Sequence, residues 1–236
     1  MNILAIESSA KAACVALCRD EFLVAESYQN SGLTHSRTLM PLCEGMLSNC
    51  GVSLSDVDLI AVANGPGSFT GLRIGIATAK GLAWPEEKPC LGVSTLEAMA
   101  WNLCGVSGIV CCAMDARRQQ VYNALFRMTE NGPERLTVDR AISLEELFAD
   151  PQTTNAMVVG DGAELCARYA QERGIALRLA PPNQRYQHAW GVARAALEQW
   201  RAGVRGSGGD LAANYLRLSQ AERERLEREK RKTPAE

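Results

Sequence analysis

The chain has 236 residues, of which 47% are hydrophobic and 22% charged, and its formal net charge is -2. These values predict a globular protein with one large or two modest domains, and they give no electrostatic reason to expect tight nucleic-acid binding. No apolar run approaches the roughly 18 residues that a membrane helix needs, and no basic leader precedes the first apolar run. We therefore expect no membrane association and a cytoplasmic location.

Nine cysteines are scattered along the chain without a Cys-x-x-Cys pair. An odd, irregular set of this kind is typical of reduced thiols that pack as small hydrophobic residues. It favours neither disulfides nor a zinc site, and it agrees with a reducing compartment.

Three strands are predicted near the N-terminus, over residues 2–6, 12–18 and 21–28. They follow one another closely, so we expect a meander. The first strand ends in Glu7, which has two interpretations. Its carboxylate is either a functional acid or a strand-end group that accepts hydrogen bonds from neighbouring backbone N–H groups.

A helix is predicted from His35 to a stop at residues 49–51. At about 100° per residue its apolar arc spans about 160°, wider than the roughly 100° stripe that one core needs. Pro41 predicts a kink or a later start of the helix. Met40 and Leu47 lie at the outer edge of the arc, so we expect them to face a partner. The residues of the arc are Leu39, Met40, Leu42, Cys43, Met46 and Leu47.

The segment NGPGSFTG (residues 64–71) joins an apolar strand at residues 59–63 to a helix predicted over residues 72–84. Open α/β sheets place functional sites at such carboxyl ends of strands. No lysine stands where a Walker loop requires one, and the glycine spacing does not fit a dinucleotide fingerprint. Ser68 also lacks the GxSxG context of a nucleophilic serine. The turn is therefore either a bare helix N-terminus that can bind an anion or a tight structural turn.

The helix after this turn is apolar nearly all round, apart from Arg73 and Lys80. Such a helix is covered on more than one side, and small residues at Gly71, Gly75 and Ala79 would allow close approach of a neighbour. Either the second domain covers these helices, or they pair with the same helices of a second molecule as a bundle of four helices. On the second interpretation the expected partner-binding residues are His35, Leu39, Met40, Leu47, Gly67, Ser68, Thr70, Arg73, Gly75, Ile76 and Lys80.

The second half of the chain repeats the order of the first half: strand, acid, polar turn, strand, turn, strand. The three strands are predicted over residues 108–115, 121–128 and 134–138, and Asp115 takes the place of Glu7. The repeat predicts two related α/β lobes, residues 1–104 and 105–218. The Gly-rich residues 206–209 predict a flexible link, and residues 219–236 form a charged tail that is either solvated or partner-binding.

The motif GPGSFTGLRIG at residues 65–75 resembles the signature of the bacterial TsaB (YeaZ) family of tRNA threonylcarbamoyladenosine biosynthesis proteins. The resemblance covers nearly the whole chain, because AIESS, HSRTLMPL, MDARRQQVY, VVGDG and NYLR also match in order. It implies the two-lobed, actin-like and acetate-kinase-like ATPase (ASKHA) fold, with a mixed sheet and flanking helices in each lobe. In that fold the first hairpin holds nucleotide phosphates and its acid helps position a metal. Glu7 occupies the place of that acid, which is usually an aspartate.

The catalytic paralogue in this family, TsaD, carries a His-x-x-x-His metal motif, and Thr95 and Met99 stand at the matching positions here. Neither side chain suits a hard metal. The resemblance therefore implies a non-catalytic subunit without a cofactor or metal of its own, ATP and metal being expected in the partner. The implied partners are TsaD directly, and the TsaE ATPase and the threonylcarbamoyl-adenylate synthase indirectly. A homodimer is expected when the chain is alone, and direct tRNA contact is not expected.

Two other functions are compatible with parts of this pattern. The first is an active ATPase or small-molecule kinase of the same fold, with Glu7, Ser8 and Asp115 around a nucleotide. The second is a metalloprotease, which the histidine content argues against, since His35 and His188 are the two histidines of the chain and lie far apart in sequence.

Overall fold

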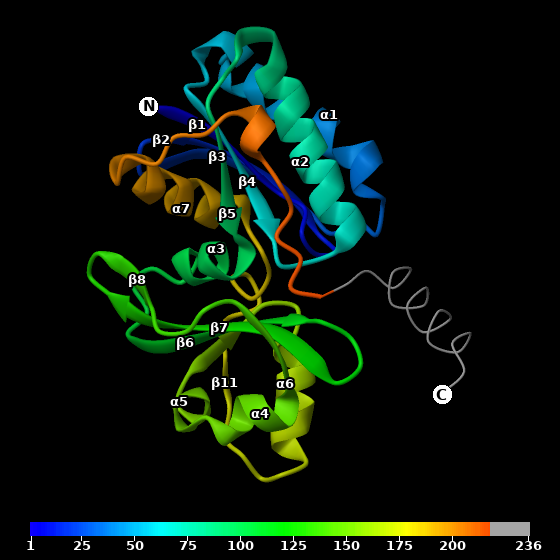
Figure 1. Cartoon of the computed structure of the whole chain (residues 1–236), viewed down its shortest axis with the longest axis vertical. Coiled ribbons are helices and arrows are strands. Elements are labelled where there is room, and N and C mark those ends of the chain that lie inside the picture. The colour runs from blue at the N-terminus through cyan, green and yellow to red at the C-terminus, as the bar shows by residue number, and fades with distance from the viewer. Residues whose placement is uncertain (218–236) are drawn as a thin grey trace, which may run out of the picture.

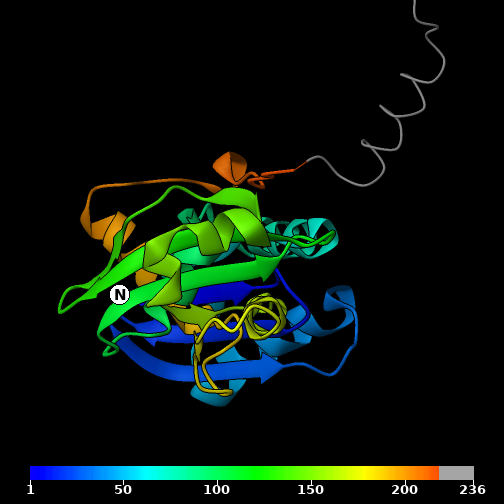
Figure 2. The ribbon, with the colours of Figure 1, turned by 90° about the horizontal axis from the view of Figure 1, so that it is seen from below.

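The computed structural model describes residues 1–217, so the predicted charged tail lies outside the described residues. The described chain folds into two stacked α/β lobes, each built on its own sheet (Figure 1). This confirms the predicted fold class. Figure 2, seen from the end of the second lobe, shows the green strands of that lobe in front of the blue strands of the first.

The first sheet has the strand order β3-β2-β1-β4-β5. Its first three strands form the predicted antiparallel meander, while β4 and β5 are parallel to β1. The sequences of β1 and β4 are continuous apolar runs, because helices cover both faces of these strands and neither face meets water. The strands are β1 (Asn2–Glu7), β2 (Ala13–Arg19), β3 (Phe22–Gln29), β4 (Leu59–Gly65) and β5 (Cys90–Ser94).

The second sheet repeats this plan with the order β11-β10-β6-β7-β8, which confirms the repeat expected from the sequence. The long strand β7 pairs first with β8 and then with β9, a short strand that was not predicted. The strands are β6 (Gly108–Asp115), β7 (Gln120–Thr129), β8 (Gly132–Arg135), β9 (Arg140–Ser143), β10 (Met157–Val159) and β11 (Arg178–Leu179).

Two helices cover one face of the first sheet: α1 (His35–Cys50) and α2 (Phe69–Ala83). Helix α1 begins at His35 with Pro41 inside it, so the late start that proline suggested does not occur. Helices α4 (Leu144–Ala149), α5 (Pro151–Thr154) and α6 (Ala163–Gln171) belong to the second lobe. No helix among residues 1–217 is long and apolar enough to cross a membrane.

The other face of the first sheet is covered by α7 (Ala189–Arg201), which also packs against α3 (Thr95–Trp101). The buried residues of α7 form one cluster with Ile3, Ala5 and Cys14 of the first sheet. The expectation that residues 105–218 form one lobe is therefore wrong at its C-terminal end. The chain returns to the first lobe because α7 is apolar along one face and that sheet is open there.

The Gly-rich segment at residues 206–209 is not the flexible link that its composition predicted. The carbonyl of Gly206 accepts a hydrogen bond from Cys90 N at 2.9 Å, and Gly208–Asp210 forms a short 3-10 helix. A Cβ on Gly206 would lie 2.6 Å from the Cys90 carbonyl oxygen, so glycine here permits close approach to β5.

All nine cysteines are free thiols, and seven of them are buried. Burial raises the pKa of Cys43 and of Cys166 to about 12. These thiols therefore behave as small hydrophobic side chains, as the sequence predicted.

Candidate functional site

A cleft of about 640 Å3 lies between the two lobes. The turn after β1, the turn after β4 and the β6–β7 turn all reach it from different parts of the chain. Its lining includes Lys11, Phe69, Asp115, Arg117, Asp161, Tyr186, Gln187 and Arg217. The carboxyl ends of β1 and β6 meet at this cleft, and open α/β sheets usually bind their ligands at such strand ends.

Glu7 does not line this cleft and is only 1% exposed. Its Oε1 accepts a hydrogen bond from Ser9 N at 2.6 Å, and its Oε2 has no partner among residues 1–217. Burial raises the pKa of Glu7 to about 7, and the negative charge of Asp161 adds to this effect. Of the two interpretations of Glu7, the geometry favours the strand-end carboxylate that accepts a backbone N–H.

Three other acids line the cleft: Asp115, Asp161 and Glu164. Asp115 is exposed, and its Oδ1 accepts a hydrogen bond from Arg117 N at 2.7 Å. Asp161, which follows β10, accepts a hydrogen bond from Gln187 Nε2 at 3.0 Å, and burial raises its pKa. The sequence motif VVGDG contains Asp161, but sequence reasoning assigned it no role, and it missed Gln187.

The cleft residues do not fit the metal–nucleotide site that the fold family implies. The acid at the end of β1 is 1% exposed and does not line the cleft, so it is not available to a cation bound there. Ser8 is fully buried, and its Oγ donates a hydrogen bond to the Gly71 carbonyl at 2.9 Å. Of the three residues expected to surround a nucleotide, only Asp115 lines the cleft.

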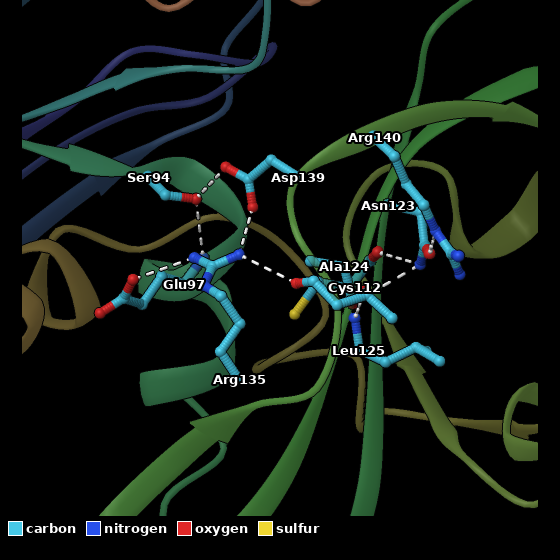
Figure 3. Close-up of polar contacts among 10 residues, drawn as sticks. Ser94, Glu97, Cys112, Asn123, Ala124, Leu125, Arg135, Asp139 and Arg140 are labelled. Carbon is cyan, nitrogen blue, oxygen red and sulfur yellow. Dashed lines mark hydrogen bonds and ion pairs between the residues drawn. The ribbon is translucent and has the colours of Figure 1, made fainter.

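The positions that match the catalytic metal motif are also buried. Thr95 and Met99 lie on α3 and are fully buried. At the start of this helix, Ser94 Oγ donates to Asp139 at 2.6 Å, and Arg135 pairs with Glu97 at 2.9 Å (Figure 3). These groups satisfy one another and tie α3 to the second lobe, so this end of the helix has a structural role.

Cys14, Glu26 and His188 bring three possible ligand atoms within 4.8 Å of one another, a group that the sequence did not reveal. Cys14 Sγ accepts a hydrogen bond from Ala189 N at 3.3 Å, and Glu26 Oε1 accepts one from Trp190 N at 3.0 Å. Glu26 Oε2 lies 3.0 Å from His188 Nδ1. All three groups therefore hold the first turn of α7 against β2 and β3, which gives this cluster a structural explanation.

A second hollow, of about 560 Å3, lies between α1 and α2 on the outer side of the first lobe. We term it the α1–α2 groove. Apolar and small side chains dominate its lining, and Met40 is 38% exposed there. The lining residues are His35, Ser36, Leu39, Met40, Ile74, Ala77, Thr78, Gly81 and Leu82.

The predicted partner-binding residues divide between this outer surface and the core. Met40, Ser68, Thr70 and Arg73 are exposed, and His35, Gly67 and Lys80 are partly exposed. Four residues are buried in the chain's own core, which corrects the prediction: Leu47 (9% exposed), Ile76 (8%), Gly75, and Leu39 (1%), which also lines the groove. The apolar arc of α1 is wide because Leu39, Cys43, Met46 and Leu47 all pack beneath it.

The small residues of α2 also serve the protein's own core. A Cβ on Gly71 would lie 2.1 Å from the Ser8 carbonyl oxygen, and one on Gly75 would lie 2.3 Å from Ser8 Oγ. Ala79 is fully buried. These residues let α2 lie close to the end of β1, so the expectation that they meet a partner is wrong.

The NGPGSFTG segment is a tight turn packed on the β1–β2 hairpin. Ser68 N donates a hydrogen bond to the Ser9 carbonyl at 2.7 Å, and Ser68 Oγ accepts one from Gly71 N at 3.3 Å as the cap of α2. His35 Nε2 lies 2.8 Å from the Ala10 carbonyl oxygen and ties the start of α1 to the same hairpin. The turn therefore positions α1 and α2 relative to the sheet.

Residues 211–217 form a segment that we term the C-terminal strap (orange in Figure 1). Asn214 N donates to the Asn64 carbonyl at 2.7 Å in the first lobe, and Arg217 Nη1 donates to the Ala116 carbonyl at 2.6 Å in the second. Between them Tyr215 stacks on Phe69 with ring centres 4.1 Å apart. The strap contains the NYLR motif, whose place beside both lobes could not be inferred from the sequence.

Two lobes with the same strand order around a cleft define this chain as a member of the two-lobed actin-like (ASKHA) class. A family model described as TsaD, tRNA N6-adenosine threonylcarbamoyltransferase, matches residues 29–221. The Bacillus subtilis tRNA threonylcarbamoyladenosine biosynthesis protein TsaB is 31% identical over 98% of this chain and all of its own length. YeaZ from Pseudomonas aeruginosa superposes with a TM-score of 0.77 at 26% identity, over 91% of this chain and all of that chain.

The chain therefore belongs to the TsaB (YeaZ) family, as the sequence resemblance predicted. It is also similar to a catalytic relative. The tRNA N6-adenosine threonylcarbamoyltransferase of Solidesulfovibrio magneticus is 48% identical over 114 residues, which cover 48% of this chain and 28% of that enzyme.

Proposed function

We propose that this chain is a non-catalytic subunit required for threonylcarbamoyladenosine modification of the tRNA adenosine next to the anticodon. Its family membership supports the role in this biosynthesis. One observation carries the rest of the proposal: the cleft acids Asp115 and Asp161 accept hydrogen bonds from this chain's own residues, whereas the α1–α2 groove is open and apolar.

The described residues support a subunit without chemistry of its own. Met99 and Thr95 are buried where the catalytic paralogue carries metal ligands, and Ser68 caps a helix. Among residues 1–217 we find no nucleophile held by a base and faced by an oxyanion site. ATP and metal would be bound by the partner.

The partner we propose for the α1–α2 groove is the catalytic paralogue TsaD. A transferase relative that is 48% identical over 114 residues supports a common origin of the two chains. A two-fold dimer uses the same patch on both chains, so a paralogue with matching helices can replace one copy. The chain alone would then form a homodimer. The TsaE ATPase and the adenylate synthase would act without direct contact, in the cytoplasm, and tRNA would contact other subunits.

A second candidate is an active ATPase or small-molecule kinase of the same fold. The cleft of about 640 Å3 with Asp115 in its lining favours it. The buried positions of Glu7 and Ser8 argue against it, since neither lines the cleft.

Reconstituted tRNA modification tests the proposed function. The catalytic paralogue, the ATPase and the synthase are combined with tRNA, and the modified nucleoside is quantified with and without this chain. We expect modification to need the chain and to be lost with Ala77→Asp, which places a charge in the α1–α2 groove. Val138→Asp, at a position that is 75% exposed in the second lobe, is the matched control. Full modification without the chain would contradict the proposal.

A further inference from the structure

An arginine and two aromatic rings form a partly exposed cluster at the start of α2, between the interlobe cleft, which Phe69 lines, and the α1–α2 groove. The Nε of Arg73 donates a hydrogen bond to the Tyr215 hydroxyl at 3.0 Å. Its guanidinium carbon lies 5.9 Å from the centre of the Phe69 ring and 5.8 Å from that of Tyr215. We term these three residues the Arg73–Tyr215 cluster. Ala77 of the groove lies one helical turn after Arg73, so cluster and groove are parts of one surface.

The charge of Arg73 has no acidic partner within the part of the chain that the structure describes. Other arginines do: Arg135 pairs with Glu97 and Arg201 pairs with Glu21. The hydrogen bond to Tyr215 uses Nε, so the donors on both Nη atoms remain without a partner among residues 1–217. An oriented guanidinium with free Nη groups matches the two oxygens of a carboxylate.

The strap keeps this guanidinium in place. Tyr215 is fixed because its neighbour Asn214 is bonded to Asn64 and because its own ring stacks on Phe69. A side chain held before binding loses less conformational entropy on binding. Tyrosine and arginine are also the residue types that contribute most to protein–protein affinity.

We propose that the Arg73–Tyr215 cluster binds a carboxylate side chain of the partner that docks on the α1–α2 groove. The inference rests on the proposed function and makes the C-terminal strap part of the interface. A protein carboxylate fits better than an RNA phosphate, because the net charge of -2 gives no electrostatic reason to expect a nucleic-acid surface.

Calorimetric titration of the full chain with the purified catalytic paralogue tests the inference. Arg73→Gln is expected to raise the Kd about 30-fold. Tyr215→Phe retains the ring but removes the hydroxyl acceptor, and is expected to raise the Kd about fivefold. The matched control is Arg178→Gln, the same substitution at an exposed arginine of β11 in the second lobe, with a change within about twofold. Thermal unfolding of each variant verifies that the fold is retained.

Several results would overturn the inference and leave the proposed function intact. Arg73→Gln could bind as the wild type does while Ala77→Asp fails to bind. Arg73→Gln and Arg178→Gln could weaken binding equally, which would indicate net charge instead of a specific pair. Arg73→Gln could also lose affinity for tRNA alone, which would assign the cluster to a phosphate. If Ala77→Asp binds the paralogue normally, the proposed docking surface itself is wrong.

Discussion

The interlobe cleft and the α1–α2 groove are hollows of comparable volume, about 640 and 560 Å3, but their linings are of opposite kinds. The cleft is lined by charged groups from both lobes, and the acid at its first strand end is buried beneath it. The groove is lined by apolar and small side chains that remain accessible. The fold forms a polar cleft between the lobes, while the apolar surface that we propose for partner binding lies on the outside of the first lobe.

The two sides of helix α2 also differ, one being packed on the protein's own sheet and the other being exposed. Its inner side carries glycines and an alanine in contact with the end of β1, which gives the helix a close fit to the sheet. Its outer side carries Arg73, Ala77 and Gly81, which are exposed. Substitutions on the two sides should therefore separate effects on folding from effects on association.

The largest expected effect is on the free energy of unfolding. It should differ between two residues of α1, Leu47, which is buried, and Met40, which is exposed. Leu47→Asp buries an unpaired charge and should lower the free energy of unfolding by about 3–5 kcal/mol. Met40→Asp lies at an exposed position and should change it by no more than about 0.5 kcal/mol, while weakening association about a hundredfold. Urea unfolding and sedimentation measure the two quantities. A stable, fully dimeric Met40→Asp variant would place the interface elsewhere.

The next effect tests whether Glu7 is a buried structural acid. Its pKa in the folded state is about 7 and its ordinary value is 4.5. Protonated Glu7 therefore contributes stability that is fully present below pH 4.5 and is lost as the pH rises through 7. Relative to Glu7→Gln, the wild type should lose about 3 kcal/mol of unfolding free energy as the pH rises through this window.

Urea unfolding at several pH values measures this loss for both proteins. Asp161 and His188 also act on the charge of Glu7. The contribution of Glu7 is therefore taken from the difference between the wild-type and Glu7→Gln stability curves. Parallel curves would show that Glu7 is ionised and solvated, as a cleft acid would be.

Two glycines of α2, each replaced by alanine, should give smaller changes in the free energy of unfolding. The changes should have opposite signs at the two positions. Gly75→Ala would place a Cβ 2.3 Å from Ser8 Oγ, so it should lower the free energy of unfolding by about 1–3 kcal/mol. Gly81 has no atom within 4 Å of the corresponding Cβ position, so Gly81→Ala should raise it by up to about 1 kcal/mol through helix propensity. Equal effects at the two sites would contradict the assignment of inner and outer faces.

The smallest expected effect is the heat of nucleotide binding at the interlobe cleft. Titration of magnesium–ATP into the isolated chain should give only heats of dilution, because Glu7 and Ser8 do not line the cleft. A stoichiometric binding isotherm in calorimetry would favour the ATPase or kinase interpretation.

Local sequence patterns determined much of the fold. Apolar runs located β1, β4 and β6, because a strand covered on both faces has no polar alternation. The repeated order of strand, acid and turn predicted the second sheet. The motif at residues 65–75 is specific enough to indicate the family from the order of its residues alone.

Tertiary structure alone decided which surfaces are free. Hydrophobic periodicity shows that α1 and α2 bury more than one side, but it does not distinguish the protein's own sheet from a partner. The buried positions of Leu47 and Gly75 follow from how closely both helices lie on the first sheet, a long-range contact that no local pattern encodes. The return of α7 and the strap to the first lobe has the same cause. These segments bond to residues more than a hundred positions away, such as Cys14 and Asn64, and only the folded chain brings those residues together.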